Sequence, residues 1–344
     1  MNKTHTMLLV LGCAGGALTM LAAPPAREGA RYDREAVKAE YRRPEVVPFP
    51  ENNKYTRARA DLGKTLFFDP RLSASGSISC ASCHKPQFAW SDSAATSSGV
   101  PGMPLKRRSP TILNMAWADS LFWDGRAATL EEQALGPIQA DVEMNMPLEK
   151  AISLLGRIGG YKALFDKAYP GEGIVPETVG KAIATFERTV VSGIAPFDEW
   201  ILGDEAAISD SAKRGFDLFN TKALCAKCHS GWNFTDNSFH DLGFVTEDRG
   251  RGKLLPQIEA AQFGFKTSTL RNIAQRAPYF HDGSVRTLEE VVDHYDKGPW
   301  QNRPSLAEEM RKLNLTGAEK RDLVEFMKSL TGVDESIVLP VLPN

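Results

Sequence analysis

Cys80-Ala81-Ser82-Cys83-His84 recurs in the second half of the chain as Cys225-Ala226-Lys227-Cys228-His229. Both stretches have the spacing C-x-x-C-H, in which two thiols reach the vinyl groups of a haem and the next histidine binds its iron. A redox-active cysteine pair would not need the histidine, and a zinc site would have to draw its four ligands from two distant segments. The sequence therefore predicts two covalently bound c-type haems, with His84 and His229 as proximal iron ligands.

The remaining cysteine lies in a segment that predicts export. Four of the five cysteines belong to the two motifs, and Cys13 lies in an apolar stretch that runs from residue 7 to residue 23, after Lys3. Such a stretch is typical of a signal peptide, which we expect over residues 1–26. Val10-Leu11-Gly12 before Cys13 also resembles a lipoprotein signal, but a small apolar residue of the signal is the simpler interpretation. The expected location is the periplasm.

The composition is that of ordinary globular domains. The chain has 344 residues, of which 42% are hydrophobic, and a formal net charge of -2 with a pI of about 6.3. This size supports one or two cores of normal dimensions. A near-neutral charge provides no basic field for a phosphate backbone, which argues against a nucleic-acid partner. The sequence carries no feature that indicates an oligomeric state.

An internal duplication organises the chain. Residues 111–132 align without a gap on residues 269–290, with identical residues at ten of 22 positions. Each copy follows its own C-x-x-C-H motif, so the two copies mark two related haem domains. We expect an N-terminal domain over residues 27–195 and a C-terminal domain over residues 196–344.

The sequence predicts a mainly α fold. Each copy of the repeat ends in a capping box, Thr129-Leu130-Glu131-Glu132 and Thr287-Leu288-Glu289-Glu290, which is typical of a helix start. Apolar residues at helical spacing extend over positions 179–190, whereas no comparable strand pattern appears. Long loops are expected at Ser97 to Pro110 and Arg249 to Pro256, which are rich in glycine and proline. The expected architecture is two cytochrome c-like haem domains that arose by duplication.

The two halves differ in the side chains that can reach the free face of each iron. Besides His84, the first half has no histidine outside the predicted signal. The sixth ligand of the first iron is therefore a methionine or is absent, and the methionines available are Met103, Met115, Met144 and Met146. An open iron is where peroxide could bind, and it would need a nearby group that transfers protons. Glu143 and Gln133 are candidates, although each also fits a solvated surface side chain.

In the second half, an apolar helical stripe points to Tyr295. Leu288, Val291 and Val292 precede it at spacings that place all four side chains on one face. His294 lies about 100° round the same helix. A buried tyrosine is more often a core aromatic than a ligand. Met310 and Met327 offer sulfur, but both fit as packing residues of the final helices.

The sequence resembles the bacterial diheme cytochrome c peroxidases and the related MauG-type enzymes from about residue 59 to residue 330. The motifs that carry the resemblance are Leu66-Phe67-Phe68-Asp69-Pro70-Arg71-Leu72, Ser79-Cys80-Ala81-Ser82-Cys83-His84, Phe122-Trp123-Asp124-Gly125-Arg126, Leu130-Glu131-Glu132-Gln133, Glu143-Met144 and Ala277-Pro278-Tyr279-Phe280-His281-Asp282-Gly283. The resemblance implies that the haem on His84 is the peroxide site, with Glu143 as acid-base catalyst and Gln133 in the same pocket. It also implies that Trp123 transfers electrons between the haems.

Three departures from the family pattern matter for function. Peroxidases of the family that need reductive activation carry a distal histidine near the position of Val100, and this chain has none. The family position for the second axial ligand of the C-terminal haem is methionine in peroxidases and tyrosine in MauG-type enzymes, and here it is Tyr295. The family's calcium site, with carbonyls expected from Arg276 and Pro278, has Arg108 in place of an asparagine ligand, which argues against calcium.

These features give one leading function and two alternatives. The leading hypothesis is a periplasmic peroxidase that reduces hydrogen peroxide at the first haem, with electrons that reach the second haem from a small protein such as a cytochrome c or a cupredoxin. The first alternative is a MauG-like enzyme that oxidises residues of a partner protein, although Ala223 replaces a tryptophan of the MauG pattern. The second is an electron-transfer cytochrome, which would leave Glu143 without a role.

Overall fold

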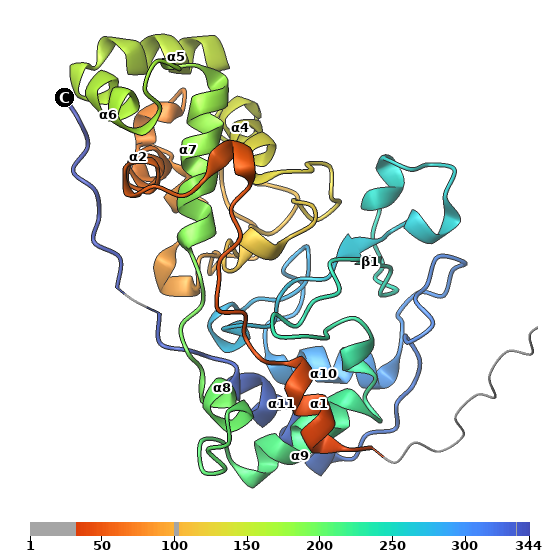
Figure 1. The fold of residues 1–344 in the computed structure, drawn as a ribbon. Helices are drawn as coiled ribbons and strands as arrows, with labels where there is room; N and C mark the ends of the chain where they lie inside the picture. Colours follow the sequence, from red (N-terminus) through yellow and green to blue (C-terminus); the bar gives the residue numbers. More distant parts are fainter. Residues whose placement is uncertain (1–31, 100–102, 335) are drawn as a thin grey trace, which may run out of the picture. The chain divides into compact units, whose positions relative to one another are not determined.

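Helices make up most of the regular structure in the computed structural model, which describes residues 32–99, 103–334 and 336–344. The α-helices are α1 (Arg34–Glu40), α2 (Arg57–Phe68), α3 (Cys80–Cys83), α4 (Leu130–Gln139), α5 (Leu148–Arg157), α6 (Gly159–Ala168), α7 (Pro176–Thr189), α8 (Pro196–Ile201), α9 (Asp210–Asn220), α10 (Leu288–Lys297) and α11 (Gly317–Ser329). Figure 1 shows them along the chain. The predicted signal peptide, with Lys3 and Cys13, and the loop position Val100 lie outside the described residues.

Short 3-10 helices and one small sheet complete the structure. The 3-10 helices are η1 (Glu51–Asn53), η2 (Pro70–Leu72), η3 (Pro86–Phe88), η4 (Met115–Trp117), η5 (Cys225–Lys227), η6 (Arg251–Lys253), η7 (Glu259–Ala261) and η8 (Ile273–Gln275). Strands β1 (Phe239–His240) and β2 (Phe265–Lys266) pair antiparallel, with Phe239 opposite Lys266. The predicted mainly helical fold is confirmed. β1, β2, η6 and η7 all lie between the haem motif and the repeat of the second half.

Each half has its own core, built on a pair of crossed helices. In the first half α2 packs against α7, and in the second α9 packs against α11. The crossings need glycine, because a Cβ atom on Gly63 would lie 1.8 Å from the carbonyl oxygen of Ala182, and one on Gly215 would lie 2.0 Å from that of Asp322. The two halves thus use the same close approach of helix backbones, as expected for duplicated domains.

The repeat itself has the same backbone geometry in both copies. Asn114 and Asn272 both have left-handed φ angles, of 61° and 55°, and each begins a 3-10 helix. The Asn114 amide donates to the carbonyl of Val190 at 2.9 Å, and the Asn272 amide donates to that of Leu330 at 3.0 Å. Each asparagine therefore bonds its repeat to the residue directly after a long helix of its own half, α7 in the first half and α11 in the second.

The predicted threonine caps are present at both repeat ends, and the complete capping box is formed at Thr287. Thr129 Oγ1 accepts a hydrogen bond from the Glu132 amide at 3.1 Å, and Thr287 Oγ1 accepts one from the Glu290 amide at 3.1 Å. These bonds satisfy amides that have no partner within the first turn, so α4 and α10 begin where the sequence predicts. Both helices carry residues that are important for the sites described below.

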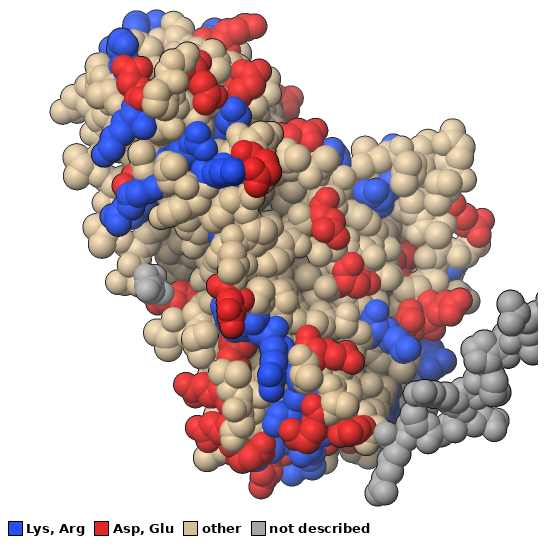
Figure 2. Space-filling view, viewed as in Figure 1, with Lys and Arg blue, Asp and Glu red and all other residues tan. Residues whose placement is uncertain are grey.

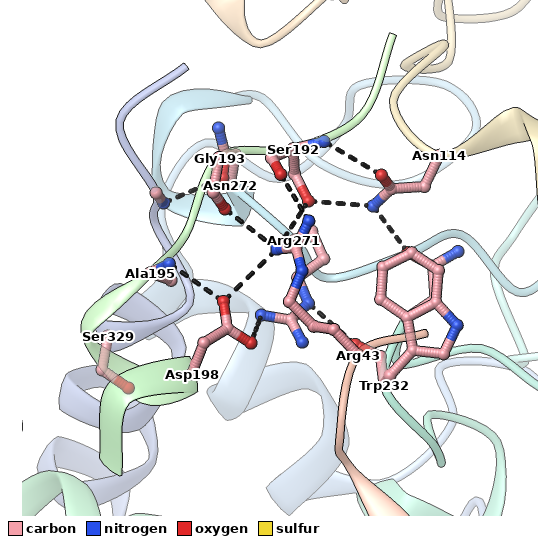
Figure 3. A network of polar contacts seen from close by, with 12 residues as sticks. Arg43, Asn114, Ser192, Gly193, Ala195, Asp198, Trp232, Arg271, Asn272 and Ser329 are labelled. Carbon is pink, nitrogen blue, oxygen red and sulfur yellow. Dashed lines mark hydrogen bonds and ion pairs between the residues drawn. The ribbon is translucent and has the colours of Figure 1, made fainter. Parts of the chain in front are cut away.

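A buried polar network joins the segment between the halves to the second repeat (Figure 3). The fully buried guanidinium of Arg271 donates to Asp198 at 2.7 Å, and Arg43 donates to the carbonyl of Gly193 at 2.9 Å. Asn114 donates to Ser192 Oγ at 3.1 Å. The connection between α7 and α8 at Ser192 and Gly193, together with Asp198 on α8, is thereby fixed by both copies of the repeat and by the N-terminal segment.

The two ends of the described chain each pack against the opposite half. Tyr41, just after α1, is 1% exposed within the core of the second half, and its hydroxyl donates to Asn220 at 2.7 Å. The C-terminal segment returns to the first half, where the Gly160 amide donates to the carbonyl of Asn344 at 3.2 Å (Figure 1). With the predicted boundary between residues 195 and 196, Tyr41 and Asn344 each contact the half to which they do not belong.

The surface carries both signs of charge. On the face shown in Figure 2, basic and acidic side chains are interspersed, with uncharged surface between them. Among the described residues, none of the helices combines the length and the apolar character needed to cross a membrane.

Candidate haem sites

The first C-x-x-C-H motif forms a single helical turn. Cys80–Cys83 are α3, and the His84 amide donates to the carbonyl of Cys80 at 2.9 Å. Both thiols are free, and burial raises the pKa of each, so neither is a reactive thiolate in its surroundings. A partly buried pair of neutral thiols beside a histidine suits thioether attachment.

The second motif has the same backbone bond and an additional contact at the histidine. The His229 amide donates to the carbonyl of Cys225 at 2.9 Å, and His229 Nδ1 lies 2.8 Å from the carbonyl oxygen of Phe234. A bond at Nδ1 fixes the ring and leaves Nε2 for iron, the arrangement usual for metal-binding histidines. Burial raises the pKa of Cys225 to about 12.

A cavity at the first motif contains the residues predicted for peroxide chemistry. It is lined by Cys80, Cys83, His84, Gln133, Glu143, Met144 and Glu187, among others. Gln133 lies on α4, and the chain folds back after this helix, with the Met146 amide donating to the carbonyl of Ile138 at 2.7 Å. This reversal brings Glu143 beside Gln133. The structure therefore places three of the predicted residues, His84, Gln133 and Glu143, around one cavity.

Of the four methionines available to the first iron, one lies at this cavity wall. Met144 is 3% exposed and lines the cavity. Met115 and Met146 pack against the core of the first half, and Met115 and the 47% exposed Met103 line a wider cavity that also contains His84.

Glu143 connects this cavity to an outer hollow. It also lines a second depression together with Arg126, Glu132 and Gln139. Burial raises the pKa of the Glu143 carboxyl, and the charge of Arg126 opposes that rise. A carboxyl with a raised pKa, in contact with both an inner cavity and an outer hollow, can exchange protons between them.

Glu187 is a second acid at this cavity, and sequence analysis did not single it out. It lies on α7, is 4% exposed, and its Oε2 has no hydrogen-bond partner among the described residues. Burial raises its pKa to about 8. In the sequence, Glu187 directly follows Phe186 on the predicted apolar helix. An acid at this position is equally typical of the solvent-facing edge of a helix, so the sequence does not indicate a site.

The second cavity contains Tyr295 and two methionines. It is lined by Cys225, Cys228, His229, Tyr295, Met310 and Met327, among others. Met310 and Met327 are 6% and 7% exposed. Burial raises the pKa of the Tyr295 hydroxyl, so a phenolate there needs a positive partner such as a ferric ion.

His294 does not line this cavity, although it is as buried as Met310 and Met327, which do. It is 2% exposed and stacks on Phe244, with ring centroids 4.6 Å apart and an interplanar angle of 8°. The sequence predicted that His294 points away from the stripe of Tyr295. It does so, but toward a separate group of aromatic rings and not toward solvent.

Trp123 lies between the second cavity and the wider cavity that contains His84. It lines the second cavity and also the wider cavity that contains His84, and its indole nitrogen donates to the carbonyl of Arg108 at 2.8 Å. His281 lines the same two cavities, 6.5 Å from Trp123 between ring centroids and stacked on Phe265 at 3.6 Å. The sequence motif contained His281, but only the fold shows that it is placed between the cavities.

Arg108 occupies the position at which a calcium ion was considered. Its guanidinium is buried and donates to the carbonyls of Asp92, Ala94 and Arg276, the last at 3.1 Å. The Arg108 amide donates to the carbonyl of His281 at 2.7 Å. Carbonyl oxygens from both halves thus converge on one side-chain cation.

A further group of ligand-type side chains adjoins the second motif. Cys228, Asp236 and His240 lie close enough to share a metal ion, but Cys228 belongs to the haem motif. His240 Nε2 is 2.7 Å from Asp236, and that hydrogen bond raises the pKa of His240 to about 10. The His240–Asp236 contact is an ion pair at the edge of the second cavity.

The residues present fit two c-type haems. Each motif supplies two free, partly buried cysteines and a histidine on the wall of a cavity. His84 Nδ1 is buried without a hydrogen-bond partner among the described residues. A haem attached to each motif would fill the cavity that the motif lines.

Comparisons with known proteins agree with this geometry. A family model described as di-haem cytochrome c peroxidase matches residues 57–206, and one described as cytochrome c matches residues 212–331. The chain is 49% identical over 325 residues to the methylamine utilization protein MauG of Methylorubrum extorquens. The alignment covers 94% of this chain and 92% of that protein.

A peroxidase and a solved structure of a MauG-like protein are also similar to this chain. The cytochrome c551 peroxidase of Pseudomonas aeruginosa is 33% identical over 340 residues, covering 96% of this chain and 94% of that protein. The crystal structure of a MauG-like protein associated with microbial copper homeostasis aligns with a TM-score of 0.77 and 30% identity, covering 84% of this chain and 94% of that one.

Proposed function

The chain belongs to the di-haem cytochrome c peroxidase family, and on this premise we propose that it uses hydrogen peroxide to oxidise side chains of a partner protein, as a MauG-like enzyme. As a member of the family it is an oxidoreductase with two c-type haems, and peroxide is its electron acceptor. The higher identity to MauG than to the cytochrome c551 peroxidase favours the first alternative of the sequence analysis over its leading hypothesis.

Tyr295 is the observation that carries the proposal. It lines the second cavity together with His229, at the position where the family resemblance implies an axial ligand. An anionic oxygen ligand stabilises oxidised iron, whereas a methionine raises the potential and favours acceptance of electrons. Tyrosine at this position therefore suits an enzyme that holds oxidising equivalents until a partner protein supplies electrons.

The chain's own residues have separate roles around the first cavity. The haem, when bound, supplies the redox chemistry of peroxide cleavage. Glu143 takes the proton from the inner peroxide oxygen and delivers it to the departing one, and Gln133 orients peroxide by hydrogen bonding. Trp123 conducts electrons between the two cavities that it lines. Tyr295 and His229 hold the second iron.

A second candidate function is supported by sulfur in the second cavity. Met310 and Met327 line it with Tyr295, so a methionine is available as an alternative ligand. Methionine ligation would favour a cytochrome c peroxidase that takes electrons from a small redox protein. The expected location of either enzyme is the periplasm, because attachment of c-type haem accompanies the predicted signal peptide.

Tyr295→Met and Met310→Leu test this proposal in the haem-loaded protein. We expect Tyr295→Met to raise the potential of the second haem and Met310→Leu to leave it unchanged, as measured by spectroelectrochemical titration. With peroxide, the wild type should oxidise tyramine coupled to dextran, and Tyr295→Met should oxidise a reduced small cytochrome c faster than the wild type does. A potential that moves with Met310 and not with Tyr295 would overturn the proposal and favour the peroxidase.

A further inference from the structure

Trp300 is an exposed aromatic ring that packs edge-on against buried rings. It is 52% exposed, whereas His294 and Phe244 beneath it are 2% and 4% exposed. Its ring centroid lies 4.7 Å from that of His294, at an interplanar angle of 77°, and 5.2 Å from that of Phe244, at 85°. These are favourable edge-to-face contacts, so the exposed ring has a defined position.

The ring contacts continue from Trp300 to the second cavity. Phe244 itself lines this cavity. His294 lies 5.6 Å from Tyr295 between centroids, and Phe280 lies 4.5 Å from Phe244 and 6.2 Å from Tyr295. Two short series of aromatic contacts therefore link the surface at Trp300 to the wall of the second haem site.

The segment that carries Trp300 is fastened on its C-terminal side. The carboxylate of Asp241, which is 1% exposed, accepts hydrogen bonds from Arg303 at 2.7 Å and from Ser305 at 2.6 Å. The Gln301 amide donates to the carbonyl of Gly243 at 2.9 Å. Although burial alone would raise it, these bonds hold the pKa of Asp241 below its usual range, so the carboxylate stays charged.

We propose that Trp300 is the relay residue through which electrons from an aromatic side chain of a partner protein reach the second haem site. This inference rests on the proposed function and names the surface that the partner must approach. Reduction of one hydrogen peroxide to two waters takes two electrons and two protons. Each electron leaves a phenol or indole ring of the partner, passes Trp300 and the rings beneath it, and ends on peroxide oxygen. The partner loses two electrons and two protons in total.

A second tryptophan pair is a less suitable entry point. Trp117 and Trp232 lie 4.7 Å apart between centroids, and Trp232 is close to His229 in the sequence. The guanidinium groups of Arg43 and Arg271 lie 5.5 Å and 5.8 Å from the Trp232 ring. Two cations beside the ring oppose its loss of an electron. Within the described part of the chain, no arginine or lysine lies over the ring of Trp300.

Trp300→Phe in the haem-loaded protein tests the proposal, because phenylalanine keeps the edge-to-face packing but is far harder to oxidise. The probe is tyramine coupled to dextran, which is too large to enter either cavity, and free tyramine serves as the small comparison. We expect loss of dextran-tyramine oxidation in Trp300→Phe, with an unchanged rate of the first spectral change after peroxide. Trp300→Tyr should restore it, since tyrosine can also be oxidised.

A second readout does not depend on turnover. Freeze-quench electron paramagnetic resonance of the wild type after peroxide, with ring-deuterated tryptophan, should show an indole radical that is absent from Trp300→Phe and present in Trp232→Phe. If Trp232→Phe lost the radical and the dextran-tyramine reaction while Trp300→Phe kept both, the relay assignment would be wrong. If the wild type oxidised neither free nor coupled tyramine, the proposed function would fail before the relay was tested.

Discussion

At the scale of single residues, the first haem site depends on how burial acts on two acids. Glu143 and Glu187 both line the cavity of His84, and burial raises the pKa of each. Arg126 offsets part of the rise at Glu143, which contacts an outer hollow, whereas Glu187 is almost entirely buried. The same physical cause therefore gives one acid that can exchange protons with solvent and one that is shielded from it.

Replacing Glu143 with glutamine should slow the reaction with peroxide while both haem spectra stay unchanged. A positioned acid-base group is worth about a hundredfold to ten-thousandfold in rate, and the amide cannot take the peroxide proton. In the wild type the rate should rise with pH through the raised pKa of Glu143, and the variant should lose this dependence. Stopped-flow spectroscopy measures both, with Glu149→Gln, an exposed site on α5, as control. Equal rates in all three proteins would remove Glu143 from the mechanism.

Replacing Glu187 with glutamine should stabilise the protein at alkaline pH. Its pKa is raised to about 8 in the folded protein from an ordinary value of 4.5, so between these values the folded state binds a proton that the unfolded state has released. Stability therefore falls as pH rises through this window, and the variant should not show that fall. Thermal unfolding at pH 5 and pH 8 tests this, with Glu177→Gln on the exposed side of α7 as control. A similar fall in both variants would contradict the assignment.

At the scale of elements, each haem domain depends on one helix crossing that leaves no room for a side chain. Gly63 on α2 meets the backbone of α7, and Gly215 on α9 meets the backbone of α11. The backbones of α7 and α11 cannot move aside for an added Cβ atom as a flexible side chain would. The crossing fixes the helices that carry Glu187 and Met327, which line the first and second cavities.

Gly215→Ala should therefore destabilise the second half even though alanine is the better helix former. Overpacking of a close contact costs roughly 1–3 kcal/mol, which exceeds the gain of about 1 kcal/mol from helix propensity. Gly156→Ala on α5 is the matched control, because nothing lies within 4 Å of a Cβ at that position. Denaturant unfolding of the haem-loaded proteins should show a loss for Gly215→Ala and no loss for Gly156→Ala. A stabilised Gly215→Ala protein would mean that the helices separate at little cost.

The local elements were predictable from the sequence, whereas contacts between distant segments were not. The caps at Thr129 and Thr287 follow from residues three positions apart, and the haem motifs follow from residues within five positions. The ring neighbours of Trp300, Phe244 and His294, come from two separate segments, so no spacing in the sequence indicates both of them. Glu187 was missed for the same reason, because its cavity forms only when α7 packs beside the first motif.

At the scale of the whole described unit, the two halves are joined by buried charge as well as by the connecting segment. Arg108 of the first half bonds to the carbonyls of Asp92 and Arg276, one from each half, and Arg271 bonds to Asp198 on α8, directly after the connecting segment. These contacts surround the region where Trp123 and His281 lie between the cavities. Rigid joining keeps the two haem sites at a fixed separation, which electron transfer between them requires.

Arg108 makes a specific prediction about calcium. Its guanidinium already bonds to the carbonyl of Arg276, one of the two carbonyls expected for calcium, and it adds a positive charge that would repel the ion. A chelator should therefore leave the melting temperature and the haem spectra of the wild type unchanged. Arg108→Met should lower the melting temperature, because each buried carbonyl left without a partner costs about 1–3 kcal/mol. Arg108→Asn removes the charge and supplies an oxygen ligand, so calcium should raise its melting temperature and a chelator should reverse the rise. Wild-type protein that lost stability with chelator and regained it with calcium would show that the ion binds beside Arg108 and that the guanidinium does not replace it.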